Sequence, residues 1–250
     1  MLAVFVNCGA IVLGSILGLI LSNKMSKKME DVIKTGAGFI TLVLGMQMAF
    51  KYQNIIFLTL AIILGGILGT VIDLDAKILS IGKLLQRLVE GKKNESLESI
   101  EVQAAELSDG KNFAYAFLNS SVLFCVGAMA ILGSFKAGIE KDYSIIFTKS
   151  ILDGFMAISF TAAMGIGTAF SAIAILVYQG GLTLLSVAVQ PYVSDVMLAE
   201  LTGSGGVLIC MIGVNLIGLR KIKTANYLPA VVFTVLFVLF EGPVKNLLGL

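Results

Sequence analysis

Long apolar stretches fill most of this chain, and short charged segments separate them. The first 23 residues carry no charged side chain, and neither do the 41 residues from Gly154 to Ser194. A helix needs about 20 apolar residues to cross about 30 Å of hydrocarbon, so the first stretch suffices for one crossing and the second for two. Lipid cannot hydrogen-bond to the backbone, and the stretches lack strict alternation. The pattern therefore predicts transmembrane helices.

Charged residues and turn signals divide the chain into eight predicted spans. The spans cover residues 3–22, 32–50, 54–73, 113–135, 145–164, 167–190, 198–219 and 225–244. The fifth and sixth spans share the long uncharged stretch and separate at Gly165-Ile166-Gly167, where two glycines permit a tight reversal. We predict an all-α fold, a polytopic transmembrane helix bundle of about eight spans that forms one transmembrane domain over residues 1–250.

The lysines and arginines concentrate in every second gap between spans. The gaps after spans one, three and seven, with their flanks, hold 13 of the 18, and the opposite side holds 5. Such an excess marks the cytoplasmic side of a membrane protein, so both chain ends are predicted to be extracytoplasmic. The bias also favours an even number of spans.

The segment 75–111 is the only sizeable predicted soluble piece. Residues 78–89 have helical periodicity and are predicted to lie along the cytoplasmic interface. Residues 91–111 are rich in Lys, Glu, Ser and Gly, which is typical of a flexible linker. The linker fits a solvated tether, and a regulatory docking site is the alternative.

Composition narrows the function classes. The chain is 57% hydrophobic and 14% charged, against about 25% charged in a typical soluble domain. Its net charge of +2 follows from where lysines sit in a bilayer, so we predict no nucleic-acid partner. Without histidine, and with Cys8, Cys125 and Cys210 in separate apolar segments, the sequence predicts no metal and no cofactor. Motifs of soluble enzymes are absent, so an enzyme is not expected.

The sequence contains a candidate internal repeat. An offset of 168 superposes Gly38, Gly45 and Gln47 on Gly206, Gly213 and Asn215. Nearby offsets superpose Gly14-Ser15 on Gly180-Gly181 and Asn54 on Asn226. Spans 1–3 then match spans 6–8 in opposite orientation, which is the inverted repeat of secondary transporters and many channels. Glycine-rich membrane helices also align by chance.

Several motifs occur in order along the chain. They are Ser121–Ser134, Lys149–Gly154, Tyr178–Gly181, Glu200–Thr202 with Gly205-Gly206, and Asn226–Ala230. With these motifs the sequence resembles, over essentially its whole length, the YqgA/YdfK family of bacterial inner-membrane proteins. The resemblance implies a bacterial polytopic protein with at most a role in transport. Residues 91–111 match no motif of this family.

Lys149 and Asp153 are the clearest candidates for chemistry. Their i, i+4 spacing puts them on one face of the fifth span and predicts a mutual ion pair. Charged residues inside a bilayer normally face a bundle interior or a watery cavity. A gate or coupling-ion site and a structural pair near the outer boundary are equally consistent with this spacing, and Asp153 is the deeper residue.

Glu200-Leu-Thr-Gly-Ser-Gly-Gly206 is the second candidate. Three glycines in four positions predict an unwound segment, with the hydroxyls of Thr202 and Ser204 and free backbone N–H groups available to a substrate. Close helix packing through small residues is the alternative. Glu200 also suits the headgroup region.

The amide side chains inside or near the spans are further candidates for lining a pathway. Inter-helical hydrogen bonding is the more frequent role of such amides. These amides are Asn7, Gln47, Asn119, Gln179 and Asn215. The predicted ion or solute pathway comprises Asp153, Lys149, Glu200, Thr202, Ser204, Gly205, Gly206, Gln179, Asn215 and Gln47.

The sequence thus predicts a transporter or channel for a small ion or polar solute in a bacterial inner membrane. The alternative is a non-transporting membrane scaffold or sensor that acts through segment 75–111. Its expected partners are the lipid bilayer and the transported ion or solute. The small-residue faces Gly14-x-x-x-Gly18 and Gly65-Gly66-x-x-Gly69 suit close packing within the protomer or in a homodimer.

Overall fold

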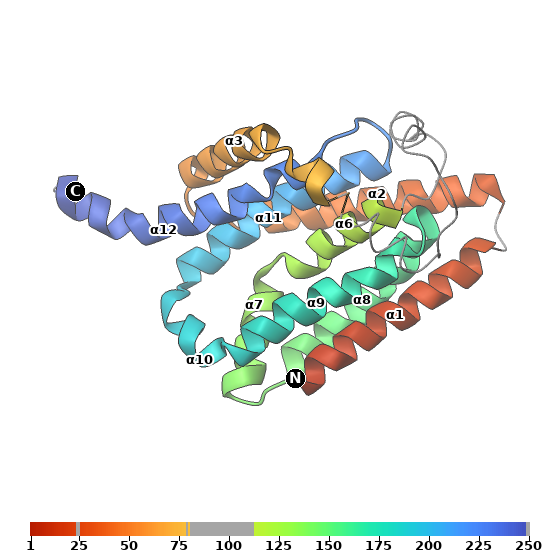
Figure 1. The fold of residues 1–250 in the computed structure, drawn as a ribbon, viewed down its shortest axis with the longest axis horizontal. Helices are drawn as coiled ribbons and strands as arrows, with labels where there is room; N and C mark the ends of the chain where they lie inside the picture. Colours follow the sequence, from red (N-terminus) through yellow and green to blue (C-terminus); the bar gives the residue numbers. More distant parts are fainter. Residues whose placement is uncertain (24–25, 79, 81–112, 249–250) are drawn as a thin grey trace.

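The computed structural model is a bundle of long helices (Figure 1), and it describes residues 1–23, 26–78, 80 and 113–248. These residues form helices and no strand, which confirms the all-α prediction. The α-helices are α1 (Leu2–Asn23), α2 (Lys27–Ala49), α3 (Ile55–Val71), α6 (Phe113–Cys125), α7 (Ala128–Ile139), α8 (Ser144–Met164), α9 (Gly167–Leu184), α10 (Ser186–Val189), α11 (Asp195–Leu216) and α12 (Pro229–Leu248). Two 3-10 helices cover Gln190–Tyr192 and Thr224–Tyr227.

The helices support a membrane protein but not the full count of eight spans. Within the described residues, six helices are long and apolar enough to cross a membrane, and the bent pair of α6 and α7 brings the number to seven. Helix α3 is apolar but has only 17 residues. Large apolar side chains face outward on the outer helices, among them Leu13 and Ile56, which are 65% and 62% exposed.

Several predicted boundaries lie within a few residues of the helix ends, but α2 begins at Lys27, five residues before the predicted start, and α9 ends at Leu184, six residues before the predicted end. Capping residues mark three of the helix starts. Ser26 and Ser194 each accept the N–H of the third residue onward, at the start of α2 and α11. Asn54 accepts the N–H groups of Ile56 and Phe57 at the start of α3. The predicted reversal between the fifth and sixth spans is confirmed at Gly165, where φ is +98°.

The fourth predicted span, 113–135, is not one helix. It breaks into α6 and α7, whose axes are bent by 63°. Gly127 stands at the break with φ +119°, a backbone conformation that side chains with a Cβ rarely adopt. The residues on both sides of Gly127 are apolar, so the hydropathy of the sequence does not indicate the break.

The predicted unwinding at Thr202–Gly206 is wrong, because α11 runs without interruption from Asp195 to Leu216. Its glycines instead permit close contact with other helices. A Cβ at Gly206 would overlap the backbone nitrogen of Ala49, and one at Gly205 would overlap the side chain of Val126. The glycine cluster therefore serves packing.

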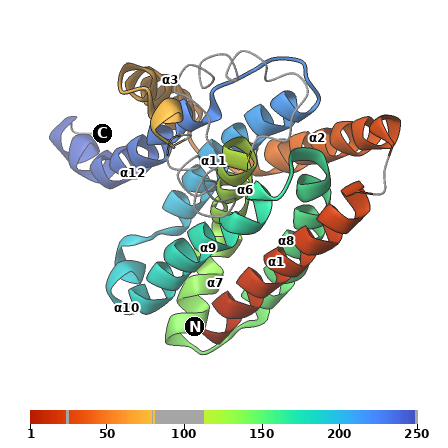
Figure 2. The ribbon, with the colours of Figure 1, turned by 45° about the vertical axis from the view of Figure 1, so that its right-hand side comes forward.

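Helices α2 and α11 form the central contact of one half of the molecule. An added Cβ at Gly45 would lie 2.6 Å from the backbone nitrogen of Cys210, and one at Gly213 would lie 2.9 Å from the carbonyl oxygen of Gly38. Later residues of α2 thus contact earlier residues of α11, so the two helices are antiparallel. Helices α3 and α12 pack beside them (Figures 1 and 2).

The other half of the molecule is built around α1, α8 and α9 (Figure 2). Gly14 packs against Gly154 and Gly18 against Ile158, so α1 and α8 run parallel. Helix α9 runs antiparallel to α1, and the Cys8 thiol lies 3.3 Å from the carbonyl oxygen of Ala172. The Gly14-x-x-x-Gly18 face is therefore used inside the protomer.

Two further predictions lie wholly or mainly outside the described residues. The linker 91–111 is one, and the interfacial helix 78–89 is the other. Residues 74–78, which follow α3, are helical.

Candidate functional site

A buried polar cluster joins three helices in the α1–α8–α9 half. It consists of Asn7 on α1, Lys149 and Asp153 on α8, and Gln179 on α9, and we call it the polar cluster. Lys149 and Asp153 form the predicted ion pair and are 6% and 7% exposed. Asn7 and Gln179 are fully buried. The structure thus brings three of the predicted pathway residues together.

The amide of Asn7 connects the other members. Its Nδ2 donates to Asp153 Oδ2 at 3.1 Å and to Gln179 Oε1 at 3.0 Å. Asp153 Oδ2 also accepts from the Lys149 ammonium. Burial of a charge is costly unless the charge is paired and hydrogen-bonded, and here the carboxylate has both kinds of partner.

Two polar atoms of the polar cluster are buried without a hydrogen-bond partner among the described residues. They are Asn7 Oδ1, an acceptor, and Gln179 Nε2, a donor. Both belong to the two amides that are hydrogen-bonded to each other. A small polar group that donates to one atom and accepts from the other, such as a hydroxyl, has the complementary chemistry.

Close packing at two glycines holds these side chains in place. Gly14 of α1 lies against the carbonyl of Gly154, the residue that follows Asp153. A Cβ at Gly14 would lie 2.2 Å from the carbonyl oxygen of Gly154 and would push α1 and α8 apart, whereas a Cβ at Gly154 would lie 3.3 Å from the carbonyl oxygen of Ala10. The absence of a Cβ at Gly14 thus lets α1 lie close enough to α8 for Asn7 to reach the Asp153 carboxylate.

The break between α6 and α7 lies next to the polar cluster. Lys149 Nζ is 5.9 Å from the ring centroid of Phe124, which belongs to the last turn of α6. The end of a helix leaves up to four backbone carbonyls without an intrahelical donor. One of them, on Val122, accepts the N–H of Val126 at 3.0 Å. Carbonyls released at a helix break inside a membrane protein are typical ligands for cations.

Glu200 has a different position from the one predicted. It is fully buried, and its Oε1 accepts the backbone N–H groups of Gln53 at 2.8 Å and Asn54 at 2.6 Å. Glu200 thereby fixes the turn between α2 and α3 to the first turns of α11. None of these hydrogen bonds involves the polar cluster.

Thr202 and Ser204 hydrogen-bond to their own helix. The Thr202 hydroxyl donates to the carbonyl of Leu198 at 2.6 Å, and that of Ser204 donates to the carbonyl of Leu201 at 3.2 Å. With no unwound backbone beside them, the geometry on which their predicted substrate contacts depended is absent.

Asn215 and Gln47 are not joined to the polar cluster either. Asn215 closes the loop after α11, since its Oδ1 accepts from the N–H of Ile222 at 2.6 Å and its Nδ2 donates to the carbonyl of the same residue at 2.8 Å. Gln47 is exposed on α2. The two residues that the repeat offset superposes therefore have different surroundings.

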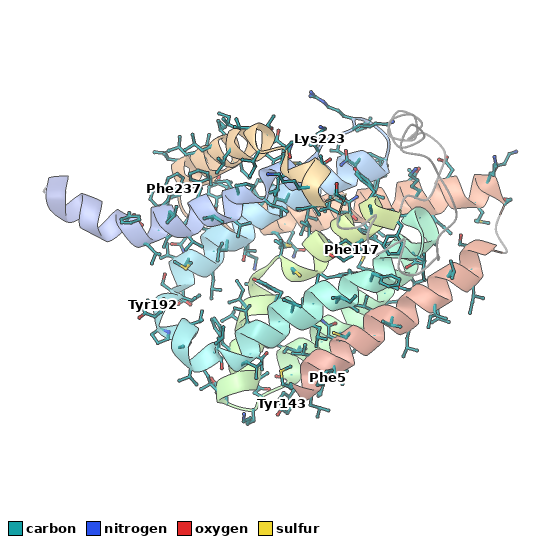
Figure 3. All side chains as sticks on the ribbon, in the orientation of Figure 1. Phe5, Phe117, Tyr143, Tyr192, Lys223 and Phe237 are labelled. Atoms are coloured by element: carbon teal, nitrogen blue, oxygen red, sulfur yellow. The ribbon has the colours of Figure 1, made fainter. Side chains whose placement is uncertain are left out.

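The end of the bundle that holds the Asn215 loop contains another buried carboxyl group. Asn226 Oδ1 accepts the backbone N–H of Asp75 at 2.8 Å, which ties the residues after α3 to those before α12. Burial raises the pKa of the Asp75 carboxyl, and the charge of Lys223 lowers it in part. Lys223 itself lies at the molecular surface (Figure 3), 3.6 Å from Asp73.

Asn7 is the member of the polar cluster that the predicted pathway omits. Its signal in the sequence is an amide inside an otherwise apolar span, the same signal that singled out Gln179. Choosing between the amides required the contact between α1 and α8, which the sequence pattern does not give.

Comparisons with known proteins agree with this membrane architecture. Residues 2–239 match a family model described as "Protein of unknown function (DUF554)". The chain is 28% identical over 241 residues to the "Uncharacterized membrane protein YdfK" of Bacillus subtilis (strain 168), covering 93% of this chain and 94% of the relative. It is 26% identical over 227 residues to the "Uncharacterized protein YqgA" of Escherichia coli (strain K12), covering 90% and 91%. No solved structure matches. The chain is therefore a member of the DUF554 family of membrane proteins.

Proposed function

We propose that this protein moves a small ion or polar solute across the bacterial inner membrane, along a path that passes the polar cluster. The buried Lys149–Asp153 pair, joined to α1 and α9 by two amides, is the observation that carries the proposal. A charge within a bilayer costs at least about 2.5–3.5 kcal/mol and commonly marks an ion or substrate pathway. The proposed role is transport rather than catalysis.

The pairing of helices supports an inverted repeat in this proposal. The offset of 168 matches Gly45 with Gly213 and Gly38 with Gly206. Gly45 contacts Gly206 and Gly213 contacts Gly38, so the two contacts are equivalent under the repeat. The other matched helices, α1 with α9 and α3 with α12, also pack against each other. If α3 is counted as a short span, the proposed topology has eight crossings and two extracytoplasmic termini.

The bend between α6 and α7 supplies the second element of the proposed path. Interrupted membrane helices bind ions and substrates in many transporters, because their ends present unpaired backbone groups. Here the interruption adjoins Lys149 through Phe124. Movement of α7 relative to α6 would change the surroundings of the ion pair.

A non-transporting scaffold or sensor is the alternative, and one observation favours it. The interface between α2 and α11 is closely packed through glycines and has no gap at the predicted substrate segment. In this alternative, segment 75–111 would bind the partner.

Flux measurements distinguish the two functions. Purified protein in liposomes is assayed with panels of cations, anions and small neutral solutes. We expect flux of at least one of them through the wild type, and its loss in Asp153→Asn and Lys149→Met. Glu140→Gln, an exposed position after α7, is the matched control and should keep the flux. Flux in Asp153→Asn equal to that of the wild type would remove the polar cluster from the path.

Cysteine labelling tests the proposed orientation. Single cysteines replace Glu140 and Lys221 in a variant without the three native cysteines. We expect a membrane-impermeant maleimide to label position 140 in intact cells and position 221 only after permeabilisation. Labelling of position 221 from outside would reverse the topology.

A further inference from the structure

A second polar site lies at the end of the bundle where α2 turns into α3. A pocket of about 370 Å³ opens there, and Gln53 and Asn54 of the turn, Glu200 of α11 and Glu241 of α12 line it together with apolar residues. Two acidic residues from helices far apart in sequence thus line one pocket. Lys51 belongs to the same turn but does not line the pocket.

Glu200 is held in a fixed orientation by the turn. Its Oε1 accepts the two backbone N–H groups of Gln53 and Asn54, while its Oε2 is buried and has no hydrogen-bond partner among the described residues. A buried carboxylate oxygen without a donor is unfavourable, and a bound cation would relieve the cost. Fixing one oxygen on the backbone leaves the other as a preorganised ligand.

We propose that this pocket binds a hard divalent cation, with Glu200 Oε2 and the Glu241 carboxylate as its charged ligands. Carboxylate and amide oxygens are the ligands that Ca²⁺ and Mg²⁺ prefer, and the exposed side chain of Gln53 can add an amide oxygen. Two carboxylates favour a divalent over a monovalent ion by charge. Since a water molecule takes about 30 Å³, the pocket has room for an ion that keeps several of its waters.

The cation would act as a clamp on three elements. It would connect the α2–α3 turn, the first turns of α11 and the second half of α12, whereas the hydrogen bonds to Glu200 Oε1 link the turn to α11 alone. Binding to the folded protein alone raises its stability as the ion concentration rises. This inference concerns a different site from the polar cluster and does not depend on transport.

The experiment measures thermal unfolding of the full chain in detergent with Ca²⁺, Mg²⁺ or Na⁺ at equal ionic strength, and Ca²⁺ binding by calorimetry. We expect Tm to rise with Ca²⁺ or Mg²⁺ but not with Na⁺. Glu241→Gln should weaken binding about tenfold or more, because one of two charged ligands is lost. Glu140→Gln, at an exposed acidic position elsewhere, should bind like the wild type.

Glu200→Gln provides a second test, because Gln keeps an oxygen that can accept the two backbone N–H groups but loses the charge. We expect it to fold and to lose the Ca²⁺-dependent rise in Tm. If it fails to fold, Glu241→Gln alone decides the question. Absence of any divalent-dependent shift in the wild type, or an undiminished shift in Glu241→Gln, would overturn the proposal.

Discussion

The α1–α8 interface and the α2–α11 interface both depend on glycine, but the first contains a buried ion pair and the second consists of close contacts between backbones. Gly14 and Gly18 let α1 approach α8 closely enough for Asn7 to reach a buried ion pair. At the other interface, Gly45 and Gly206 bring two backbones into contact. The hydroxyl of Thr202, one turn before Gly206 on α11, donates to a carbonyl of its own helix. Glycine content alone therefore does not distinguish the two interfaces, and the buried polar groups beside the glycines do.

Breaking the ion pair should have the largest effect on stability. We expect Lys149→Met or Asp153→Asn alone to cost about 3–5 kcal/mol, because each leaves an unpaired polar or charged partner in the interior. The double variant should lose less than the sum of the two. Unfolding in detergent with a double-mutant cycle measures the coupling. Additive losses would mean that the two side chains act independently and that the polar cluster is not a unit.

A methyl group at the α2–α11 interface should have the next largest effect. Gly206→Ala is expected to destabilise the fold by about 1–3 kcal/mol, since its Cβ would overlap the backbone of Ala49. Gly36→Ala is the matched control on α2, where nothing lies within 4 Å of an added Cβ. It should be neutral or stabilising by up to about 1 kcal/mol. Equal behaviour of the two variants in thermal unfolding would contradict the close packing.

A smaller effect is expected from Asp75, a buried carboxyl group outside both interfaces, whose substitution should change how stability depends on pH. Its raised pKa means that the folded protein holds the proton more tightly than the unfolded chain does. The resulting stability is present below the pKa of the unfolded chain and is lost as pH rises through the higher pKa of the folded state. Asp75→Asn should remove this part of the pH dependence and increase stability slightly at pH 7. An unchanged profile of Tm against pH would show that the side chain is solvated.

Removal of the Thr202 hydroxyl should have the smallest effect. Thr202→Val is expected to change stability by about 0.5 kcal/mol or less, because the hydroxyl bonds a carbonyl of its own helix. Flux should equal that of the wild type. A large loss of flux with normal unfolding would extend the path to the α2–α11 interface and blur the distinction between the two regions.

The sequence predicted what depends on neighbours along the chain. Uncharged stretches located the helices, and the i, i+4 spacing of Lys149 and Asp153 predicted their ion pair. The link from Asn7 to Asp153 could not be predicted, because it depends on which helices are adjacent in space. Dependence on contacts between distant helices also explains why the effects of the glycines on helix continuity were predicted wrongly. Gly127 breaks a helix and Gly203 to Gly206 do not, although local propensity alone would favour the opposite.

The pairing of α2 with α11 has a consequence for biosynthesis. Helix α2 is made early, yet the partner that covers Gly38 and Gly45 begins at Asp195, so this interface must wait until most of the chain has been inserted. The members of the polar cluster are all synthesised by Gln179. A nascent chain can therefore assemble its buried charges first, while α2 stays in lipid with its small-residue face uncovered until translation nears its end.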